Sequence, residues 1–99
     1  MIRQDFSIEG YWKVTVLYNI WLGKPNTGFT HTDFNKKWSI VAISTSSSKS
    51  QFTNTLLHEI KHLQSHICKY YKVAEDSEDA AYLTGYIAQK MYPVFRRFI

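Results

Sequence analysis

The segment from Phe52 to Ile67, FTNTLLHEIKHLQSHI, decides the fold that the sequence predicts. Its large apolar residues recur at intervals of four, four, three and four, which places them on one side of an α-helix. They are Phe52, Leu56, Ile60, Leu63 and Ile67. Ser48 precedes this run, and Gln51 lies three residues after Ser48. This pair fits a capping box at a helix start. We therefore predict a helix that begins after Ser48 and extends towards Tyr70 and Tyr71.

The same helix carries the pattern His58-Glu59-Ile60-Lys61-His62, or HExxH. Histidines at i and i+4 lie one turn apart on one face, so two imidazole nitrogens can bind one Zn²⁺ at about 2.0–2.1 Å. Both histidines lie away from the centre of the apolar stripe, whereas Glu59 projects towards its margin. A glutamate in that position can take a proton from a zinc-bound water. The pattern predicts metal ligands at His58 and His62 and a general base at Glu59; the alternative is a solvated helix face with coincidental histidines.

A second helix is predicted after a break at Val73-Ala74. The acidic segment from Glu75 to Asp79 fits its first turn, with Asp76 or Ser77 as the cap. Its apolar stripe consists of Ala80, Leu83, Ile87 and Met91. Pro93 is predicted to end this helix, which leaves residues 94–99 as a tail whose aromatic side chains need a cover.

A catalytic zinc site needs a third protein ligand, and Glu78 is the candidate on the second helix. Glu78 shares one side of this helix with Ala81 and Gly85, small residues that would let two helix backbones approach closely. If this side covers the histidine face, the Glu78 carboxylate completes the metal site. The alternative interpretation is an acidic first turn that the helix dipole favours.

Three further residues are weaker candidates for metal ligands. His66 continues the histidine row but lies about 6 Å further along the helix axis. His31 falls in a predicted loop, and Cys68 lies off the histidine row. A metzincin-type extension would require a glycine at position 65 and a histidine at position 68, where this chain has Ser65 and Cys68. We expect His66, His31 and Cys68 to have surface or packing roles.

The N-terminal half of the chain predicts strands. Turn-forming residues at 23–28 separate a period-two pattern between Tyr11 and Trp21 from a more fully apolar run at 38–44. Residues 29–37 are predicted to form a loop or a short extra strand. The apolar or aromatic even positions of the first pattern are Trp12, Val14, Val16, Tyr18 and Ile20. We therefore predict an α+β fold, with a small antiparallel sheet packed against the HExxH helix and a second, glutamate-bearing helix, as one domain over residues 1–99.

Composition and charge exclude several classes of protein. A hydrophobic content of 44% with 16% aromatic residues excludes a disordered chain. The single cysteine cannot form an internal disulfide and fits a reducing compartment. We expect a soluble, cytoplasmic protein, because the N-terminus lacks the apolar segment of a signal peptide and no apolar run approaches the roughly 20 residues of a membrane span.

The net charge of +4 allows a nucleic-acid partner, but the basic residues do not cluster. Lys36-Lys37 and Arg96-Arg97 are isolated pairs, so we expect no nucleic-acid and no membrane partner. The core of a 99-residue domain is modest, and a metal or a partner chain, including a second copy in a homo-oligomer, could stabilise it.

The HExxH pattern at residues 58–62, followed sixteen residues later by Glu78, resembles the gluzincin arrangement of a histidine helix and a glutamate ligand on the next helix. Residues 30–93 are also similar to small zincin-like proteins carried by phages and mobile elements of gut bacteria. The resemblance implies zinc held by His58, His62 and Glu78, with Glu59 as general base and residues 38–44 beside the substrate cleft. Larger gluzincins supply a tyrosine or histidine to stabilise the oxyanion. Here Tyr82 and Tyr86 are candidates for that role, and we expect them to pack instead.

The sequence therefore predicts a zinc-dependent peptide hydrolase, a metallopeptidase that acts on a peptide or protein substrate. The alternative is a non-catalytic, zinc-stabilised interaction module, for instance a phage accessory protein, and a basic nucleic-acid-binding domain has the least support. Glu59 favours catalysis, because a purely structural metal site has no use for that carboxylate.

Overall fold

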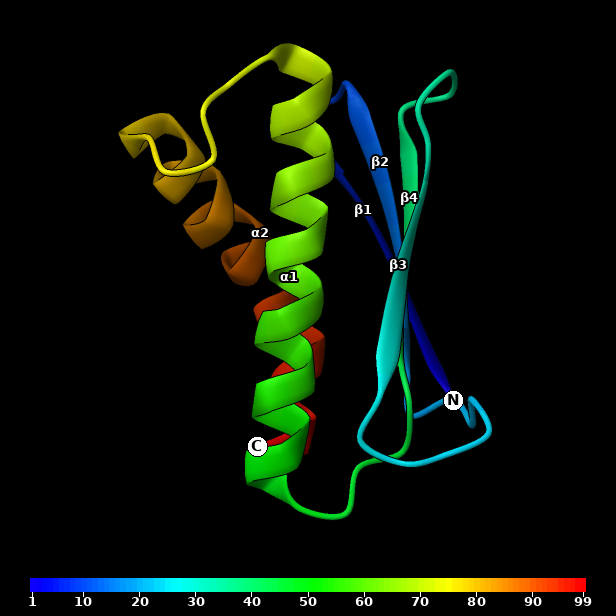
Figure 1. Cartoon of the computed structure of the whole chain (residues 1–99). Helices are drawn as coiled ribbons and strands as arrows, with labels where there is room; N and C mark the ends of the chain where they lie inside the picture. Colours follow the sequence, from blue (N-terminus) through cyan, green and yellow to red (C-terminus); the bar gives the residue numbers. More distant parts are fainter.

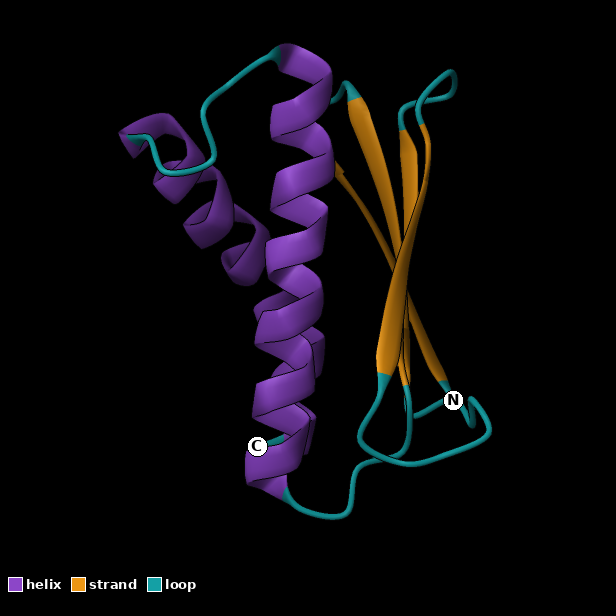
Figure 2. Cartoon of the chain, viewed as in Figure 1, coloured by secondary structure: helices purple, strands orange, loops and turns teal.

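The computed structural model describes all 99 residues and consists of a four-stranded sheet with two long helices on one of its faces (Figures 1 and 2). The strands are β1 (Ile2–Ile8), β2 (Trp12–Tyr18), β3 (Gly28–Asp33) and β4 (Trp38–Ile43). The helices are α1 (Lys49–Tyr71) and α2 (Glu78–Phe95), followed by the short 3₁₀-helix η1 (Arg96–Phe98). The predicted α+β fold is confirmed. Neither α1 nor α2 combines the length and the hydropathy that a membrane-spanning helix needs.

The sheet is mixed, with the strand order β1-β2-β4-β3, and the predicted antiparallel sheet is wrong in this respect. β1 pairs with β2 and β3 pairs with β4 in antiparallel hairpins, but the central strands β2 and β4 run parallel. The segment after β2 leads to β3, which is the outer strand of the sheet. β4 then lies between β2 and β3. The edge of β3 that faces away from β4 is therefore unpaired.

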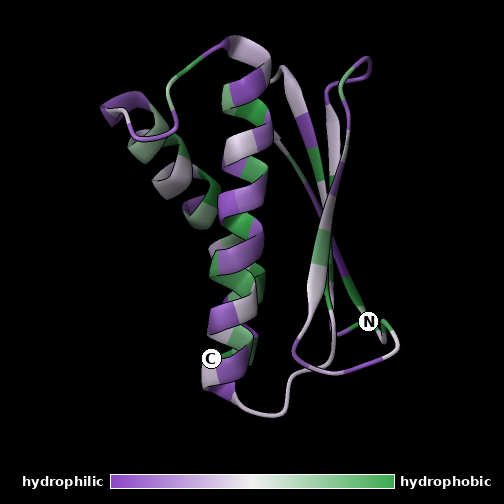
Figure 3. Cartoon of the chain, viewed as in Figure 1, coloured by the Kyte–Doolittle hydropathy of each residue, from purple (hydrophilic) through white to green (hydrophobic).

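The core forms between β2 and α1. The predicted stripe of α1 is confirmed, and the predicted strand pattern is confirmed as far as Tyr18, where β2 ends; Ile20 lies beyond the strand and is only half-buried. The inward side chains of β2 are at most 1% exposed: Trp12, Val14, Val16 and Tyr18. The predicted stripe of α1 is at most 3% exposed: Phe52, Leu56, Ile60, Leu63 and Ile67. Polar and apolar residues alternate along α1 in Figure 3. Burying each of these large side chains contributes about 1.5–3 kcal/mol to stability, so their burial determines how α1 lies on the sheet.

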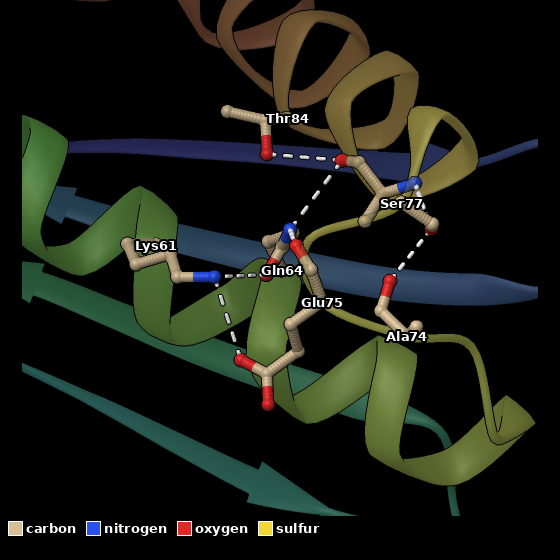
Figure 4. A network of polar contacts seen from close by, with 7 residues as sticks. Lys61, Gln64, Ala74, Glu75, Ser77 and Thr84 are labelled. Atoms are coloured by element: carbon tan, nitrogen blue, oxygen red, sulfur yellow. Dashed lines mark hydrogen bonds and ion pairs between the residues drawn. The ribbon is translucent and has the colours of Figure 1, made fainter.

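The start of α1 and its connection to α2 are held by polar contacts. Ser48 Oγ accepts a hydrogen bond from the Gln51 N–H at 3.1 Å, which confirms the predicted cap. At the other end, the buried Gln64 amide donates to the Glu75 carbonyl at 3.1 Å and to the Ala80 carbonyl at 3.5 Å (Figure 4). These bonds join the side of α1 that carries Gln64 to the first turn of α2.

Helix α2 begins at the predicted cap Ser77 and does not end at Pro93 as predicted. It continues to Phe95, and η1 then places the half-buried Phe98 against the core, where its ring stacks on Phe52 at 5.1 Å and on Tyr18 at 5.6 Å between centroids. Pro93 removes one backbone donor from the helix, and the burial of the following aromatic side chains offsets that loss. The aromatic side chains of residues 94–99 therefore pack against the core.

Candidate metal centre

His58 and His62 lie one turn apart on the exposed side of α1, with their rings close together. Their Nε2 atoms are 3.1 Å apart and their ring centroids 4.7 Å apart, and the His58 side chain is 64% exposed. Two nitrogens at about 2.0–2.1 Å from one tetrahedral zinc ion are themselves about 3.3 Å apart. The two histidines are therefore spaced to bind one ion from solvent.

Glu59 points away from solvent, into the contact between α1 and β3, and its side chain is only 3% exposed. Its Oε1 atom accepts a hydrogen bond of 2.8 Å from the Thr30 hydroxyl, and its Oε2 atom lies 3.9 Å from His58 Nε2. No lysine or arginine forms an ion pair with this carboxylate. A carboxylate withdrawn from water with one neutral donor is costly, and here its second oxygen remains available beside a candidate metal ligand.

Gly28 makes room for the Glu59 carboxylate. A Cβ atom at this position would lie 3.0 Å from Glu59 Cγ, 3.2 Å from Glu59 Oε2 and 2.6 Å from the Ala42 carbonyl oxygen. Only glycine fits between α1 and the sheet at this point. The strand that borders the centre is therefore β3, through Gly28 and Thr30, and not the strand of residues 38–44 that the family resemblance implied, which lies one position further inside the sheet.

Glu78 does not join the two histidines. It is exposed in the first turn of α2, and α2 meets α1 on the side that carries Gln64. No three histidine, cysteine, aspartate or glutamate side chains form a group that could hold a metal ion. The structure thus brings together His58, His62 and the neighbouring Glu59, and it leaves Glu78 outside this group.

The side of α2 that was predicted to cover the histidines faces solvent instead. Ala81 and Gly85 are exposed, and a Cβ at Gly85 would have no neighbour within 4 Å. The residues of α2 that are buried come from its apolar stripe: Ala80, Ile87 and Met91. Packing through that stripe removes far more apolar area from water than packing through alanine and glycine would. The stripe is therefore the side of α2 that packs.

His66 is held by a chain of hydrogen bonds that begins in the core. The Trp12 indole N–H donates to Ser39 Oγ at 3.0 Å, and Ser39 Oγ lies 2.7 Å from Thr32 Oγ1. Thr32 Oγ1 lies in turn 2.7 Å from His66 Nδ1. Thr32 thus contacts His66 from the same face of β3 from which Thr30 contacts Glu59, because alternate residues of a strand share a face.

The donor and acceptor roles in this chain follow from the indole, which can only donate. Ser39 accepts that bond, and Thr32 is the one other side chain in hydrogen-bond contact with it, so we predict that Ser39 donates to Thr32 and that the Thr32 hydroxyl donates to His66 Nδ1. This direction predicts that the neutral His66 ring carries its proton on Nε2. Burial, followed by the charges of neighbouring basic groups, lowers the pKa of His66 and favours the neutral form. In that tautomer His66 offers no free lone pair to a metal ion.

The remaining candidates lie elsewhere. His31 is exposed on β3 between Thr30 and Thr32, so its side chain projects from the opposite face of the sheet. Cys68 is 1% exposed, and burial raises the pKa of its thiol, which keeps it protonated. Tyr82 and Tyr86 are on α2 and line a hollow that contains neither histidine of the HExxH pattern. None of these residues can complete the centre where it stands.

Sequence reasoning did not identify the residues of β3 and β4 that hold the centre. They are Gly28, Thr30, Thr32 and Ser39. A signal for three of them was present, because Gly28, Thr30 and Thr32 alternate with Phe29 and His31 and so predict a strand with one small, polar face.

No protein-family model, curated protein or solved structure matches this chain. The chemistry available at the centre follows from its own groups. Two convergent imidazoles, a buried carboxylate beside them and a hydroxyl that orients this carboxylate are groups suited to metal-assisted hydrolysis.

Replacement of Gly28 by alanine should lower the free energy of unfolding by about 1–3 kcal/mol, because the new methyl group is forced against a backbone carbonyl and the Glu59 side chain. Gly85→Ala is the matched control. It adds the same group to an open position inside a helix and should raise stability by about 0.5–1 kcal/mol. Chemical denaturation of both variants measures the two effects, and equal changes would contradict the close approach of β3 to α1.

The neutral ring of His66 should be found as the Nε2–H tautomer. Long-range nitrogen–proton correlation spectra of isotope-labelled protein, recorded above the pKa of His66, distinguish this form from the Nδ1–H form. Thr32→Val removes the donor to Nδ1 and should shift the ring towards a mixture of tautomers, whereas Thr30→Val should leave it unchanged. An Nδ1–H signal in the unmodified protein would reverse the assigned direction of the hydrogen bonds.

Proposed function

We propose that this chain is a zinc-dependent peptide hydrolase whose metal ligands include His58 and His62 and whose general base is Glu59. The observation that carries the proposal is the convergence of the two Nε2 atoms at 3.1 Å with a buried carboxylate oxygen 3.9 Å from one of them. Histidines that are coincidental on a solvated face need no buried carboxylate beside them, and burying one costs free energy.

Each group has a distinct task in this proposal. When bound, zinc polarises a carbonyl group and lowers the pKa of a water molecule. His58 and His62 act as neutral ligands through their facing Nε2 atoms. Thr30 holds Glu59 Oε1, which directs the second oxygen of the carboxylate towards the histidines. That oxygen accepts the proton of the attacking water and passes it to the leaving amine.

The position of β3 supports a peptide as the substrate. β3 is an edge strand, and its outer edge is unpaired next to the residue pair of Thr30 and Glu59. Backbone N–H and C=O groups on a free edge can pair with an extended peptide, which would then lie along the metal centre. This arrangement favours an extended chain over a compact small molecule.

The alternative, a non-catalytic zinc-stabilised module, has weaker support. Structural zinc sites are closed by four protein ligands, and this chain brings only two histidines together. An ion held there would keep positions open for water and substrate, as catalytic sites do and closed structural sites do not, and a catalytic site would need one further protein ligand. Glu59 would also have no task in a structural site.

The purified protein should bind one zinc ion per chain, and His58→Ala or His62→Ala should each weaken binding by at least about 10-fold. Glu78→Ala should leave the affinity within a few-fold, because this carboxylate is not grouped with the histidines. Competition with a chromophoric chelator measures the affinities, and zinc should raise the unfolding temperature of the unmodified protein. No zinc binding would contradict the proposal, and a strong loss in Glu78→Ala would show that α2 moves to the centre.

Glu59→Gln should lower the hydrolysis of denatured protein substrates by at least about 10²-fold while zinc affinity stays within a few-fold. The amide retains the size of the side chain and an oxygen for the Thr30 hydroxyl, but it cannot take a proton. Thr30→Val, which keeps the base but removes its orienting bond, should reduce activity to a smaller extent. Undiminished hydrolysis by Glu59→Gln would show that another group activates the water.

A further inference from the structure

A groove of about 620 Å³ lies between α1, α2 and the turn that joins β1 to β2. The first half of α2 stands away from the sheet in Figure 1, which opens this groove on the side of α1 that faces α2. Its apolar wall includes Ile8, Ile67 and Leu83. The volume is in the range of about 300–1,000 Å³ that is typical of ligand pockets. None of the residues of the candidate metal centre lines it.

Four tyrosines from three elements line the groove: Tyr11, Tyr71, Tyr82 and Tyr86. Tyr11 and Tyr71 pack edge to face with their centroids 5.6 Å apart, and Tyr82 is 71% exposed. The faces of aromatic rings attract cations. Tyr86 already shows this behaviour within the chain, since the Lys90 ammonium lies 5.7 Å from its ring centroid.

The charge of the groove is negative, although the chain as a whole carries a net charge of +4. Glu9 and Asp79 contribute its two carboxylates, neither forms an ion pair within the protein, and no lysine or arginine lines the groove. Glu9 and Tyr11 line the groove together, and the pKa of Tyr11 is raised first by burial and then by the charge of Glu9. Cys68 in the lining stays neutral, because burial raises the pKa of its thiol.

We propose that this groove binds an organic cation with an apolar body, that is, a protonated aliphatic or arylalkyl amine. The ammonium group lies between the tyrosine rings and the unpaired carboxylates of Glu9 and Asp79, and the hydrocarbon body covers the apolar wall. An anion would meet the two carboxylates, and a neutral compound would gain nothing from their charge. This binding site is independent of zinc and of the proposed hydrolysis.

Three compounds with one carbon skeleton test the proposal on the full chain: phenylbutylamine, phenylbutanol and phenylbutyrate, which are cationic, neutral and anionic near neutral pH. Titrations followed by amide chemical shifts should show the amine binding at the groove with a dissociation constant on the order of 1 mM. The alcohol should bind at least about 5-fold more weakly, and the anion should bind most weakly. Equal binding of amine and alcohol, stronger binding of the anion, or no saturable shifts with the amine would overturn the proposal.

Variants separate the charged and aromatic contributions. Combining Glu9→Gln with Asp79→Asn should weaken binding of the amine without changing binding of the alcohol, and the preference that remains should be that of the tyrosine rings. Tyr82→Ala should weaken the amine more than the alcohol, and it is 71% exposed, so the fold should persist. Asp33→Asn on the distant edge strand β3 is the matched control and should change nothing. Sedimentation at the NMR concentration tests for self-association. If the chain self-associates and the amide signals of the groove are lost as a result, the groove belongs to a second copy of the chain and the proposal is overturned.

Discussion

Helix α1 can bury only one side against the sheet, and this constraint determines where every residue of the HExxH pattern points. The rotation between successive residues of a helix is constant. Burial of Phe52, Leu56 and Leu63 therefore determines the side of α1 from which each remaining side chain projects. His58 and His62 therefore reach solvent. Glu59 meets the edge strand β3, and Gln64 meets α2.

The most costly part of this arrangement is the Glu59 carboxylate. It occupies space that an apolar side chain would fill at lower free energy, and it has a single hydroxyl donor. The surrounding structure accommodates it in two ways, because Gly28 provides room and Thr30 provides the hydrogen bond. Local rules of packing are commonly broken at functional sites, where another requirement outweighs stability. The Glu59 contact is the clearest such place in this chain.

The two sides of α1 have different chemistry as a consequence of where α2 packs. On one side, the histidines, the Glu59 carboxylate and the unpaired edge of β3 lie together, and the chain of hydrogen bonds from Trp12 to His66 orders the next turn. On the other side, α2 covers the sheet but diverges at its first half, which leaves the tyrosine-lined groove. Helix α2 is thus a cover for the core and a wall of the groove, and it is not a lid over the candidate metal centre.

The sequence by itself determined the elements whose evidence is local. The period-two pattern of Trp12, Val14, Val16 and Tyr18 predicted β2, the stripe and the Ser48 cap predicted α1, and the i, i+4 spacing predicted that His58 and His62 converge. Tertiary structure alone decided the parallel pairing of β2 with β4, the continuation of α2 past Pro93, the contacts of Glu59 and His66 with β3, and the exclusion of Glu78 from the histidines. The physical reason is that periodicity defines which side of an element is apolar, whereas the partner of that side depends on which of several distant surfaces buries the most apolar area. For α2, the apolar stripe of Ala80, Ile87 and Met91 packed and the small-residue side beside Glu78 stayed exposed. The spacing within the helix defined that stripe but not the surface that it would meet.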